Sequence, residues 1–263
     1  MPTACITGAS SGIGKEFALQ LGKQGYNLIL IARNYEALRK IAAEIDTKCK
    51  IITCDLASER ACINLAGQLK KYNISILINN AGFGDIGAFY KTSLSKDLDM
   101  IDVNVRAAHI LTKELLPDFI RRDKGYILNV ASSAGLLPGG PYMATYYATK
   151  AYVTSFTSAI SEELKALHSH VSVSVLCPGP VDTNFNNVAN VQFALKGISA
   201  SYCARYALKK MYQKKLIIVP TFTMKAAVFS ARLLPRSTML KITSKQQTKK
   251  FHRSSPSARQ LFR

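Results

Sequence analysis

Tyr146 and Lys150 stand four positions apart in the segment Tyr146-Tyr147-Ala148-Thr149-Lys150, and their side chains can share a proton. Positions i and i+4 lie on one face of a helix, so we expect the Lys150 ammonium to lie near the Tyr146 phenol. A phenol has a pKa of about 10 in water, and a nearby cation lowers the pKa because it stabilises the phenolate. Lowering it by roughly three units takes about 4 kcal/mol, which two positive groups acting together can supply. The pair predicts an acid/base centre assisted by a second positive group.

A glycine-rich turn opens the chain, with the sequence Thr7-Gly8-Ala9-Ser10-Ser11-Gly12-Ile13-Gly14. Glycines between a strand and a helix allow a tight turn and the close approach of a pyrophosphate, which rests on the helix N-terminus. The glycine spacing differs from the commonest dinucleotide fingerprint, but the position after an apolar run and before an amphipathic segment is the context that such a motif requires. We therefore expect a bound nicotinamide dinucleotide, whose oxidised ring is the second positive group. The alternative is a turn that binds nothing.

Arg33 follows the second apolar run, Asn27–Ile31, and no acid occurs before Glu36. An enzyme that prefers NAD usually carries an Asp or Glu at this place, which bonds the ribose hydroxyls, whereas an Arg accommodates a 2′-phosphate. The planar guanidinium offers several donors to that phosphate. The sequence therefore predicts NADP(H) as the cofactor, with a merely solvated Arg33 as the alternative.

Short apolar runs alternate with amphipathic segments along the chain. The runs predict strands at 2–7, 27–32, 50–54, 75–79, 125–130, 171–177 and 216–219. The amphipathic segments predict helices at roughly 13–24, 35–46, 58–72, 94–122, 145–168 and 200–214. Continuously apolar strands that alternate with helices indicate a parallel sheet covered on both faces, which is a doubly wound α/β fold. The polar stretch 184–198 interrupts the alternation and predicts a loop or lid over a site.

Together these residues resemble the short-chain dehydrogenase/reductase family over roughly residues 3–220. The matching segments are Thr7 to Gly14, Asp55-Leu56, Asn79-Asn80-Ala81-Gly82, Asn104, Ser133 with Tyr146 and Lys150, and Pro178-Gly179-Pro180-Val181-Asp182-Thr183. The resemblance implies a Rossmann-type sheet with strand order 3-2-1-4-5-6-7, and frequent homodimers or homotetramers. With Arg33 added, the expected cofactor-binding residues are Gly8, Ser10, Ser11, Gly12, Ile13, Gly14, Arg33, Asp55, Leu56, Asn80, Ala81, Gly82, Tyr146, Lys150, Pro178, Gly179, Val181 and Thr183.

The resemblance also implies catalytic roles for Asn104, Ser133, Tyr146 and Lys150. Tyr146 is expected to donate a proton to a carbonyl oxygen as hydride arrives from the nicotinamide, and Ser133 to hydrogen-bond that oxygen. Ser132 is the neighbouring alternative, but Ser133 has the family spacing to Tyr146. Tyr142 and Tyr147 have no Lys four residues later. The histidines show no ligand spacing, so we expect no metal site.

The charge of the chain is unevenly distributed. Its net charge is +19, yet all 16 acids precede residue 183, and 16 of the 35 Lys and Arg residues follow it. Such asymmetry indicates an anionic partner, such as a membrane surface or an acidic carrier protein, although a basic surface without a partner is an equal alternative. We expect a catalytic domain over 1–220, and a basic extension over 221–263 with a helix at 221–234 that Pro235 ends and a flexible tail from about 237. The helix is expected to pack on the core or on another subunit, or else to lie on a membrane.

The first apolar run begins at Thr3 and leaves no room for a signal peptide, and no run of about 18 apolar residues occurs. We therefore expect a cytoplasmic protein, with association to a membrane through the basic extension as an alternative. The scattered cysteines favour reduced thiols.

The expected pocket walls, 83–86, 136–142 and 185–193, are rich in apolar and aromatic side chains, which favours a lipophilic substrate. The sequence as a whole predicts an NADPH-dependent reductase of a ketone or aldehyde. A non-catalytic NADPH-binding regulator whose basic tail binds a partner is the alternative. A nucleic-acid-binding protein is not expected, because aromatic and basic residues do not interleave on a recognisable module.

Overall fold

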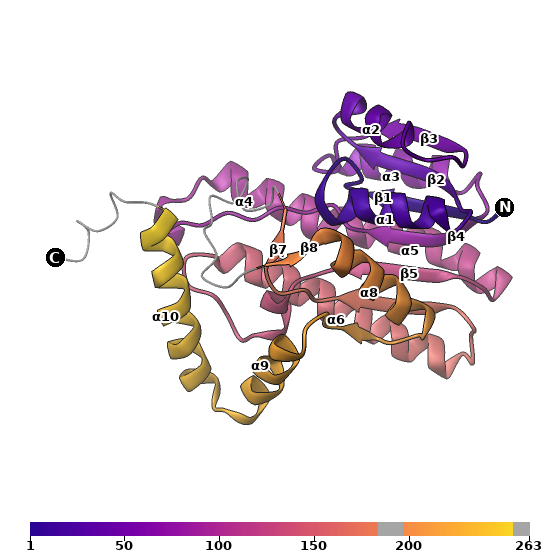
Figure 1. Cartoon of the computed structure of the whole chain (residues 1–263). Helices are drawn as coiled ribbons and strands as arrows, with labels where there is room; N and C mark the ends of the chain where they lie inside the picture. Colours follow the sequence, from indigo (N-terminus) through magenta and orange to yellow (C-terminus); the bar gives the residue numbers. More distant parts are fainter. Residues whose placement is uncertain (184–196, 255–263) are drawn as a thin grey trace.

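A seven-stranded parallel sheet forms the centre of the protein, with the order β3-β2-β1-β4-β5-β6-β9 (Figure 1). The structure is a computed structural model that describes residues 1–183 and 197–254, without the side chains of 249–254. The sheet strands are β1 (Thr3–Thr7), β2 (Asn27–Ala32), β3 (Cys49–Thr53), β4 (Ile74–Asn79), β5 (Tyr126–Val130), β6 (Ser172–Leu176) and β9 (Ile217–Ile218). This arrangement confirms the predicted doubly wound fold and the predicted strand order.

Helices cover both faces of the sheet, as the apolar strands require. The helices are α1 (Gly12–Lys23), α2 (Tyr35–Ala42), α3 (Glu59–Leu69), α5 (Ala107–Arg122), α6 (Ala144–Ala166) and α8 (Ala200–Tyr212). Side chains of α1, α2 and α8 pack on one face in a single core cluster, and those of α3, α5 and α6 pack on the other. Because the strands are parallel, the carboxyl ends of β1, β2, β4 and β5 lie at one edge of the sheet. Ligands bind at this edge in such folds.

The predicted helix at 94–122 is divided by a wider turn. It consists of α4 (Leu94–Ile101), a π-helical turn η2 (Asp102–Arg106) and α5. A π turn inserts one extra residue into a helix and is frequent at functional sites. Here the turn contains the buried Asn104.

The segment after β6 forms a small ladder of its own. Strand β7 (Val181–Asp182) pairs in parallel with β8 (Ile198–Ser199). The expected loop at 184–198 therefore ends in a strand, and its residues 184–196 lie outside the described part of the chain.

Two helices follow the sheet and lie beside the carboxyl edge (Figure 1). Helix α9 (Phe222–Leu233) agrees with the predicted helix, and α10 (Arg236–Ser254) occupies most of the stretch that was expected to be a flexible tail. Met239, Thr243 and Gln247 of α10 are almost fully buried. These side chains are four residues apart and form one helix face, so packing on the rest of the protein stabilises α10 although its sequence is polar.

Candidate active site

The glycine-rich turn between β1 and α1 is fastened to the end of β4. The Asn80 side-chain amide donates to the carbonyls of Thr7 and Gly8, at 3.0 and 3.2 Å. The Thr7 hydroxyl accepts from the backbone N–H groups of Asn80 and Ala81. Gly8 has a φ of +65°, and a Cβ there would lie 2.8 Å from the Ala81 Cα. Glycine at this position therefore permits both the left-handed backbone and the close approach of two strand ends.

The N-terminus of α1 is open to an anion. The Ser11 side chain makes no capping hydrogen bond, and the first turn contains no acid. The first backbone N–H groups of a helix have no partner within the helix and carry its positive dipole end. Thr183 approaches from the segment after β6, and a Cβ on Gly12 would lie 3.3 Å from its side chain. The turn thus offers a site for a pyrophosphate, bordered by Thr183.

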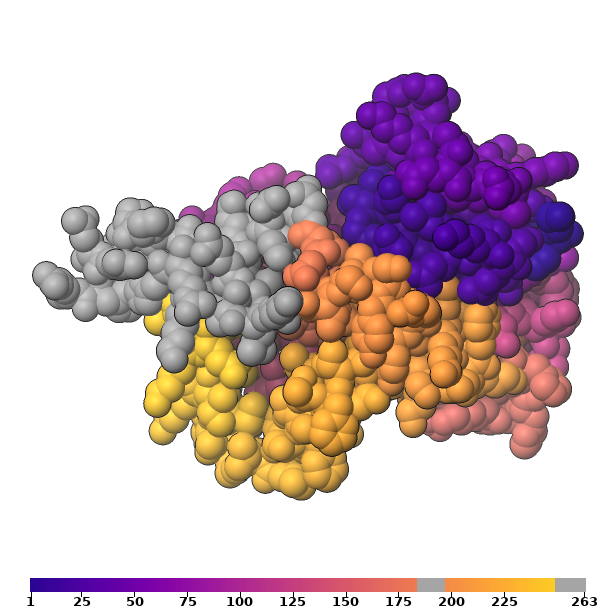
Figure 2. Space-filling model, in the orientation of Figure 1, coloured from indigo at the N-terminus to yellow at the C-terminus, as the bar shows by residue number. Residues whose placement is uncertain are grey.

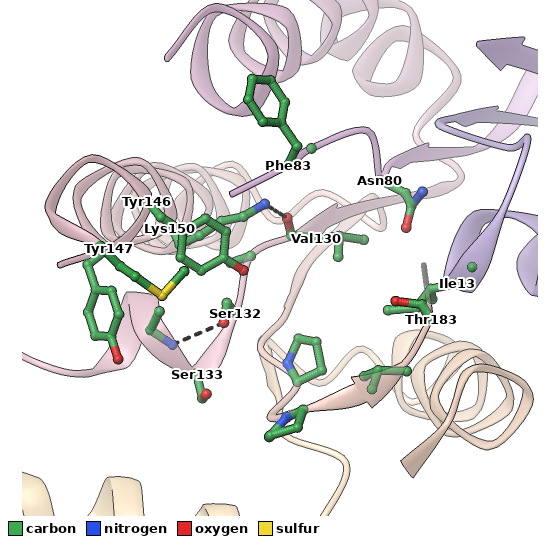
Figure 3. A pocket seen from close by; sticks show the side chains of 18 of the residues that line it. Ile13, Asn80, Phe83, Val130, Ser132, Ser133, Tyr146, Tyr147, Lys150 and Thr183 are labelled. Atoms are coloured by element: carbon green, nitrogen blue, oxygen red, sulfur yellow. Dashed lines mark hydrogen bonds between the residues drawn. The ribbon is translucent and has the colours of Figure 1, made fainter. Parts of the chain in front are cut away.

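Tyr146 and Lys150 lie one turn apart on α6 and face the carboxyl edge of the sheet (Figure 3). The Lys150 ammonium donates to the Val130 carbonyl at the end of β5, at 3.0 Å, and lies 5.9 Å from the centre of the Tyr146 ring. Only 9% of Tyr146 and 4% of Lys150 are exposed. The predicted proximity of the two side chains is therefore present in the structure.

Burial controls the protonation of both groups. It raises the pKa of Tyr146 to about 12, and a hydrogen bond with Ser132 opposes the rise. It also lowers the pKa of Lys150 to about 8. The predicted lowering of the phenol pKa required Lys150 and an oxidised nicotinamide ring together. For the side chains alone, burial has the larger effect because it disfavours the phenolate and the ammonium alike. Tyr146 is therefore a neutral phenol, which is the form that can donate a proton.

Ser132, and not the expected Ser133, faces Tyr146. Ser132 forms the hydrogen bond with the phenol, and its hydroxyl also accepts from the Ala134 N–H at 3.1 Å. Ser133 points away from the phenol in Figure 3, and its N–H donates to the Pro178 carbonyl. Ser132 has an extended backbone, in which successive side chains point in opposite directions. The spacing of thirteen residues to Tyr146 thus points to Ser133, whereas the hydroxyl that faces the phenol is that of Ser132.

Asn104 joins three segments behind Lys150. Its amide oxygen accepts from the Phe83 N–H at 2.9 Å, and its amide nitrogen donates to the Phe83 carbonyl and to the Thr149 hydroxyl. A Cβ on Gly82 would lie 2.8 Å from the Asn104 oxygen and 3.1 Å from the Lys150 nitrogen. The π turn therefore brings Asn104 against the loop that follows β4 and against α6, next to the Lys150 ammonium.

A single cavity of about 1150 Å³ connects these groups. Its lining includes the expected site residues Gly8, Ser10, Ser11, Gly12, Ile13, Arg33, Asp55, Leu56, Asn80, Ala81, Gly82, Ser133, Tyr146, Lys150, Pro178, Gly179, Val181 and Thr183, together with Ser132. Gly14 and Asn104 lie behind this lining: a Cβ on Gly14 would collide with the Gly8 carbonyl, and Asn104 holds Phe83. The structure thus brings the sequence-predicted residues to one place.

Apolar side chains surround the other end of the cavity. The lining there includes the apolar or aromatic residues Phe83, Leu137, Met143, Tyr147, Met224, Ala227, Ala231, Leu234, Met239 and Ile242, and the polar residues Ser230, Thr243, Gln246 and Gln247. Phe83 and Leu137 belong to the expected walls, whereas Leu136 packs in a core cluster with Val153 and Cys177. The third expected wall, 185–193, lies outside the described residues. The contribution of α9 and α10 was not predicted, and the four-residue spacing of Met239, Thr243 and Gln247 is the signal that could have revealed it.

Comparisons with known proteins agree with this geometry. A family model described as short chain dehydrogenase matches residues 2–192. The very-long-chain 3-oxoacyl-CoA reductase of Coprinopsis cinerea is 39% identical over 170 residues, which are 62% of this chain and 50% of that protein. The human 17-beta-hydroxysteroid dehydrogenase type 3 is 33% identical over 199 residues, which are 73% of this chain and 63% of that protein. The chain therefore spans about half the length of the reductase that it matches.

A solved structure is similar over more of the chain. The short-chain dehydrogenase from Sphingobium yanoikuyae in complex with NADPH has a TM-score of 0.80 and 28% sequence identity. The similarity covers 89% of this chain and 94% of that one.

Proposed function

The chain belongs to the short-chain dehydrogenase/reductase family of oxidoreductases, which act on CH–OH and C=O groups, and we propose that it is an NADPH-dependent reductase of a lipophilic ketone or aldehyde. One observation carries the proposal: the Tyr146 phenol, the Ser132 hydroxyl and the Lys150 ammonium meet in one cavity with the glycine-rich turn. A binding protein without chemistry has no need of a buried ammonium beside a buried phenol.

Four side chains have distinct roles in the proposed carbonyl reduction. Tyr146, a neutral phenol, donates its proton to the carbonyl oxygen, and Ser132 hydrogen-bonds the same oxygen as negative charge develops there. The Lys150 ammonium stabilises the phenolate that remains. Asn104 keeps Phe83 and Thr149 in place and thereby positions the segments on either side of Lys150. In the direction of alcohol oxidation, the same groups act in reverse.

The residues at the other end of the cavity fit a nicotinamide dinucleotide phosphate. The open N-terminus of α1 suits the pyrophosphate, with Ser10, Ser11, Gly12 and Ile13 around it, and Asp55 and Leu56 border the adenine end. The bound cofactor supplies the hydride that the carbonyl carbon accepts. Pro178, Gly179, Val181 and Thr183 would hold the nicotinamide end.

Arg33 supports the choice of NADP(H) over NAD(H). It lies directly after β2, is exposed and lines the cavity, and it forms no ion pair with the described residues. The nearest acid in the sequence, Glu36, pairs with Arg39 at 3.1 Å. The guanidinium is therefore available for a 2′-phosphate. The similar Sphingobium yanoikuyae enzyme was solved with NADPH, which agrees with this choice.

The lipophilic substrate is inferred from the apolar end of the cavity, where side chains from α9 and α10 meet Leu137 and Met143. The names of the similar proteins, a very-long-chain 3-oxoacyl-CoA reductase and a 17-beta-hydroxysteroid dehydrogenase, point to the same class of carbonyl compound. We propose that a long acyl chain or a fused ring system occupies this end. A homodimer or homotetramer and a cytoplasmic location stay predictions.

The test is the oxidation of NADPH, followed by absorbance, with a panel of carbonyl compounds that includes 3-oxoacyl thioesters, ketosteroids and small polar ketones. We expect turnover of the lipophilic members and a loss of turnover in Tyr146→Phe, while the Kd for NADPH changes little. Substantial turnover in Tyr146→Phe would contradict the acid role. Tight NADPH binding with no turnover of any carbonyl would favour the regulatory protein.

A further inference from the structure

We propose that α9 docks the protein on an anionic membrane surface through one exposed face. Phe222, Phe229 and Leu233 form this face, and 83%, 64% and 71% of these residues is exposed. They are seven and four residues apart, so they project from the same side of the helix. Met224 and Val228 lie on the opposite side, where Val228 is buried and Met224 lines the cavity. We call Phe222, Phe229 and Leu233 the outer face of α9.

Basic residues flank the outer face of α9, and the sequences of α9 and α10 contain no acid. Lys225 and Arg232 follow one border of the helix, and Arg236, Lys241 and Lys245 are exposed on α10. Lys225 is held in place because it donates to the Tyr206 hydroxyl at 2.9 Å. The sequence contains no Asp or Glu after residue 182. A helix with apolar side chains on one face and basic residues beside it is typical of the interface between lipid headgroups and acyl chains.

The basic and apolar residues together favour an anionic bilayer over a second copy of the chain or an acidic protein. In a symmetric contact between two copies, each outer face would meet its own counterpart, and the basic residues of one copy would oppose those of the other. An acidic protein would satisfy the basic residues but would need a matching pocket for three projecting apolar side chains. An anionic bilayer accommodates the basic residues and the apolar side chains. Its phosphate groups contact the ammonium and guanidinium groups, while its acyl region takes up Phe222, Phe229 and Leu233. None of the helices in the described residues is long and apolar enough to cross a membrane, so the contact is with the surface.

The outer face of α9 lies beside a part of the cavity lining that is exposed at the surface. Ala227 and Ser230 of α9 and Leu234 directly after it are exposed and also line the cavity, as do Ile242 and Gln246 of α10. The cavity lining therefore reaches the surface at these two helices, which are neighbours on the face seen in Figure 2. If the substrate is lipophilic, as proposed above, it can pass from the bilayer into the cavity without crossing water. The docking itself does not depend on turnover and is tested without it.

Vesicle sedimentation with the full chain tests the docking. We expect binding to vesicles of phosphatidylcholine with phosphatidylserine, and much weaker binding to phosphatidylcholine alone. The variant F222S/F229S/L233S removes the apolar face, and R232Q/R236Q/K241Q removes neighbouring charges; each should weaken binding by at least about tenfold. The control I63S/L167S changes two apolar residues that are 51% and 64% exposed elsewhere and should bind as the unchanged protein does. Thermal melting and NADPH binding verify that each variant is folded.

A site-specific probe is available because the chain contains no tryptophan. In Phe229→Trp, we expect the fluorescence of the introduced indole to shift to the blue on addition of the anionic vesicles, whereas in Ile63→Trp it should not shift. Absence of binding to anionic vesicles, undiminished binding by F222S/F229S/L233S, or no shift in Phe229→Trp would each overturn the proposal. Binding that depends on the charged residues alone would overturn the apolar contact and favour an acidic protein partner.

Discussion

Gln247 of α10 donates a hydrogen bond to the hydroxyl of Tyr147, the residue that directly follows the proposed acid on α6, at 2.5 Å. Both side chains are nearly buried and line the cavity, and the oxygen of the Gln247 amide has no hydrogen-bond partner among the residues that the structure describes. The bond joins residues that are 100 positions apart. It therefore connects the last described helix to α6, the helix that carries the proposed acid.

Removal of this bond should loosen α10 and weaken substrate binding. Tyr147→Phe leaves the Gln247 amide without its remaining partner, and an unpaired buried donor costs about 1–3 kcal/mol. We expect KM for a lipophilic substrate to rise by roughly tenfold, with little change in the Kd for NADPH, since the cofactor end of the cavity is untouched. Hydrogen exchange should be faster in α10. Tyr152→Phe removes a hydroxyl that contacts His109 on the exposed side of the same helix, and it is the matched control. Equal effects in both variants would contradict a specific role for the Tyr147 bond.

The two neighbouring serines should differ sharply in mutagenesis. Ser132→Ala removes the hydroxyl that faces Tyr146, and the loss of one donor to a developing oxyanion typically lowers kcat by about 10²–10³. Ser133→Ala should lower kcat by no more than about threefold, because its hydroxyl points away from the phenol. Measured NADPH affinity controls for local disturbance, because Ser132 also accepts from the Ala134 N–H. If Ser133→Ala is the more damaging change, the expectation from sequence spacing is restored.

The sequence predicted those features that are encoded within one short segment. Tyr146 and Lys150 share a helix turn, and Gly8 to Gly14 directly join a strand to a helix, so local geometry fixes their relation. The residues between the two serines and Tyr146 include an irregular loop with Pro138, Gly139 and Gly140. Loops tolerate insertions, so the number of residues from the serine to Tyr146 is not fixed by the fold. The position of Ser132 is fixed instead by its place two residues after the end of β5 at Val130, and that spacing does not include the loop.

Features that depend on burial in the folded protein were harder to predict from the sequence. Helix α10 is rich in Ser, Thr, Lys and Gln, which resembles a disordered tail in composition. Its stability comes from Met239, Thr243 and Gln247, which are buried against the rest of the protein. The sequence shows the charge of Lys150 but not the burial of Tyr146 and Lys150, so the effect of burial on both pKa values was not predicted.

Arg33→Asp should shift the preference between the cofactors. The substitution removes a charged donor and places a carboxylate where the 2′-phosphate is expected, and a hydrogen bond to a charged group contributes about 1.5–3 kcal/mol. We expect kcat/KM for NADPH to fall by roughly 10- to 100-fold while that for NADH changes little or rises. Arg39→Gln is the control, because Arg39 is paired with Glu36 on α2 and does not line the cavity. An unchanged ratio of the two kcat/KM values in Arg33→Asp would argue against the role of Arg33.

The pH dependence should differ between reduction and oxidation. Lys150, with a pKa lowered to about 8 by burial, is protonated at lower pH and loses its charge as the pH rises through that value. The phenolate formed during reduction then lacks its cation, so kcat/KM for reduction should fall above a pH of about 8. Oxidation begins from the phenolate, which higher pH favours, and should accelerate. Profiles of kcat/KM in both directions measure this. A reduction profile that stays level through this range would exclude Lys150 as the titrating group, and Lys150→Met should be slow at every pH.

The same substitution at two glycines should have opposite effects on stability. In Gly14→Ala the new methyl group would lie 2.1 Å from the Gly8 carbonyl oxygen, so the glycine-rich turn must move away from α1. We expect lower stability and weaker NADPH binding, because the turn and the first N–H groups of the helix separate. Gly67 lies on the exposed side of α3, and beyond the adjoining turns of its own helix none of the described residues would contact the added carbon. Gly67→Ala should therefore stabilise the protein by about 0.4–1 kcal/mol through the reduced entropy of the unfolded chain. Denaturant unfolding and NADPH titration of both variants provide the measurement. Normal NADPH affinity in Gly14→Ala would show that the close packing at this turn is not required for cofactor binding.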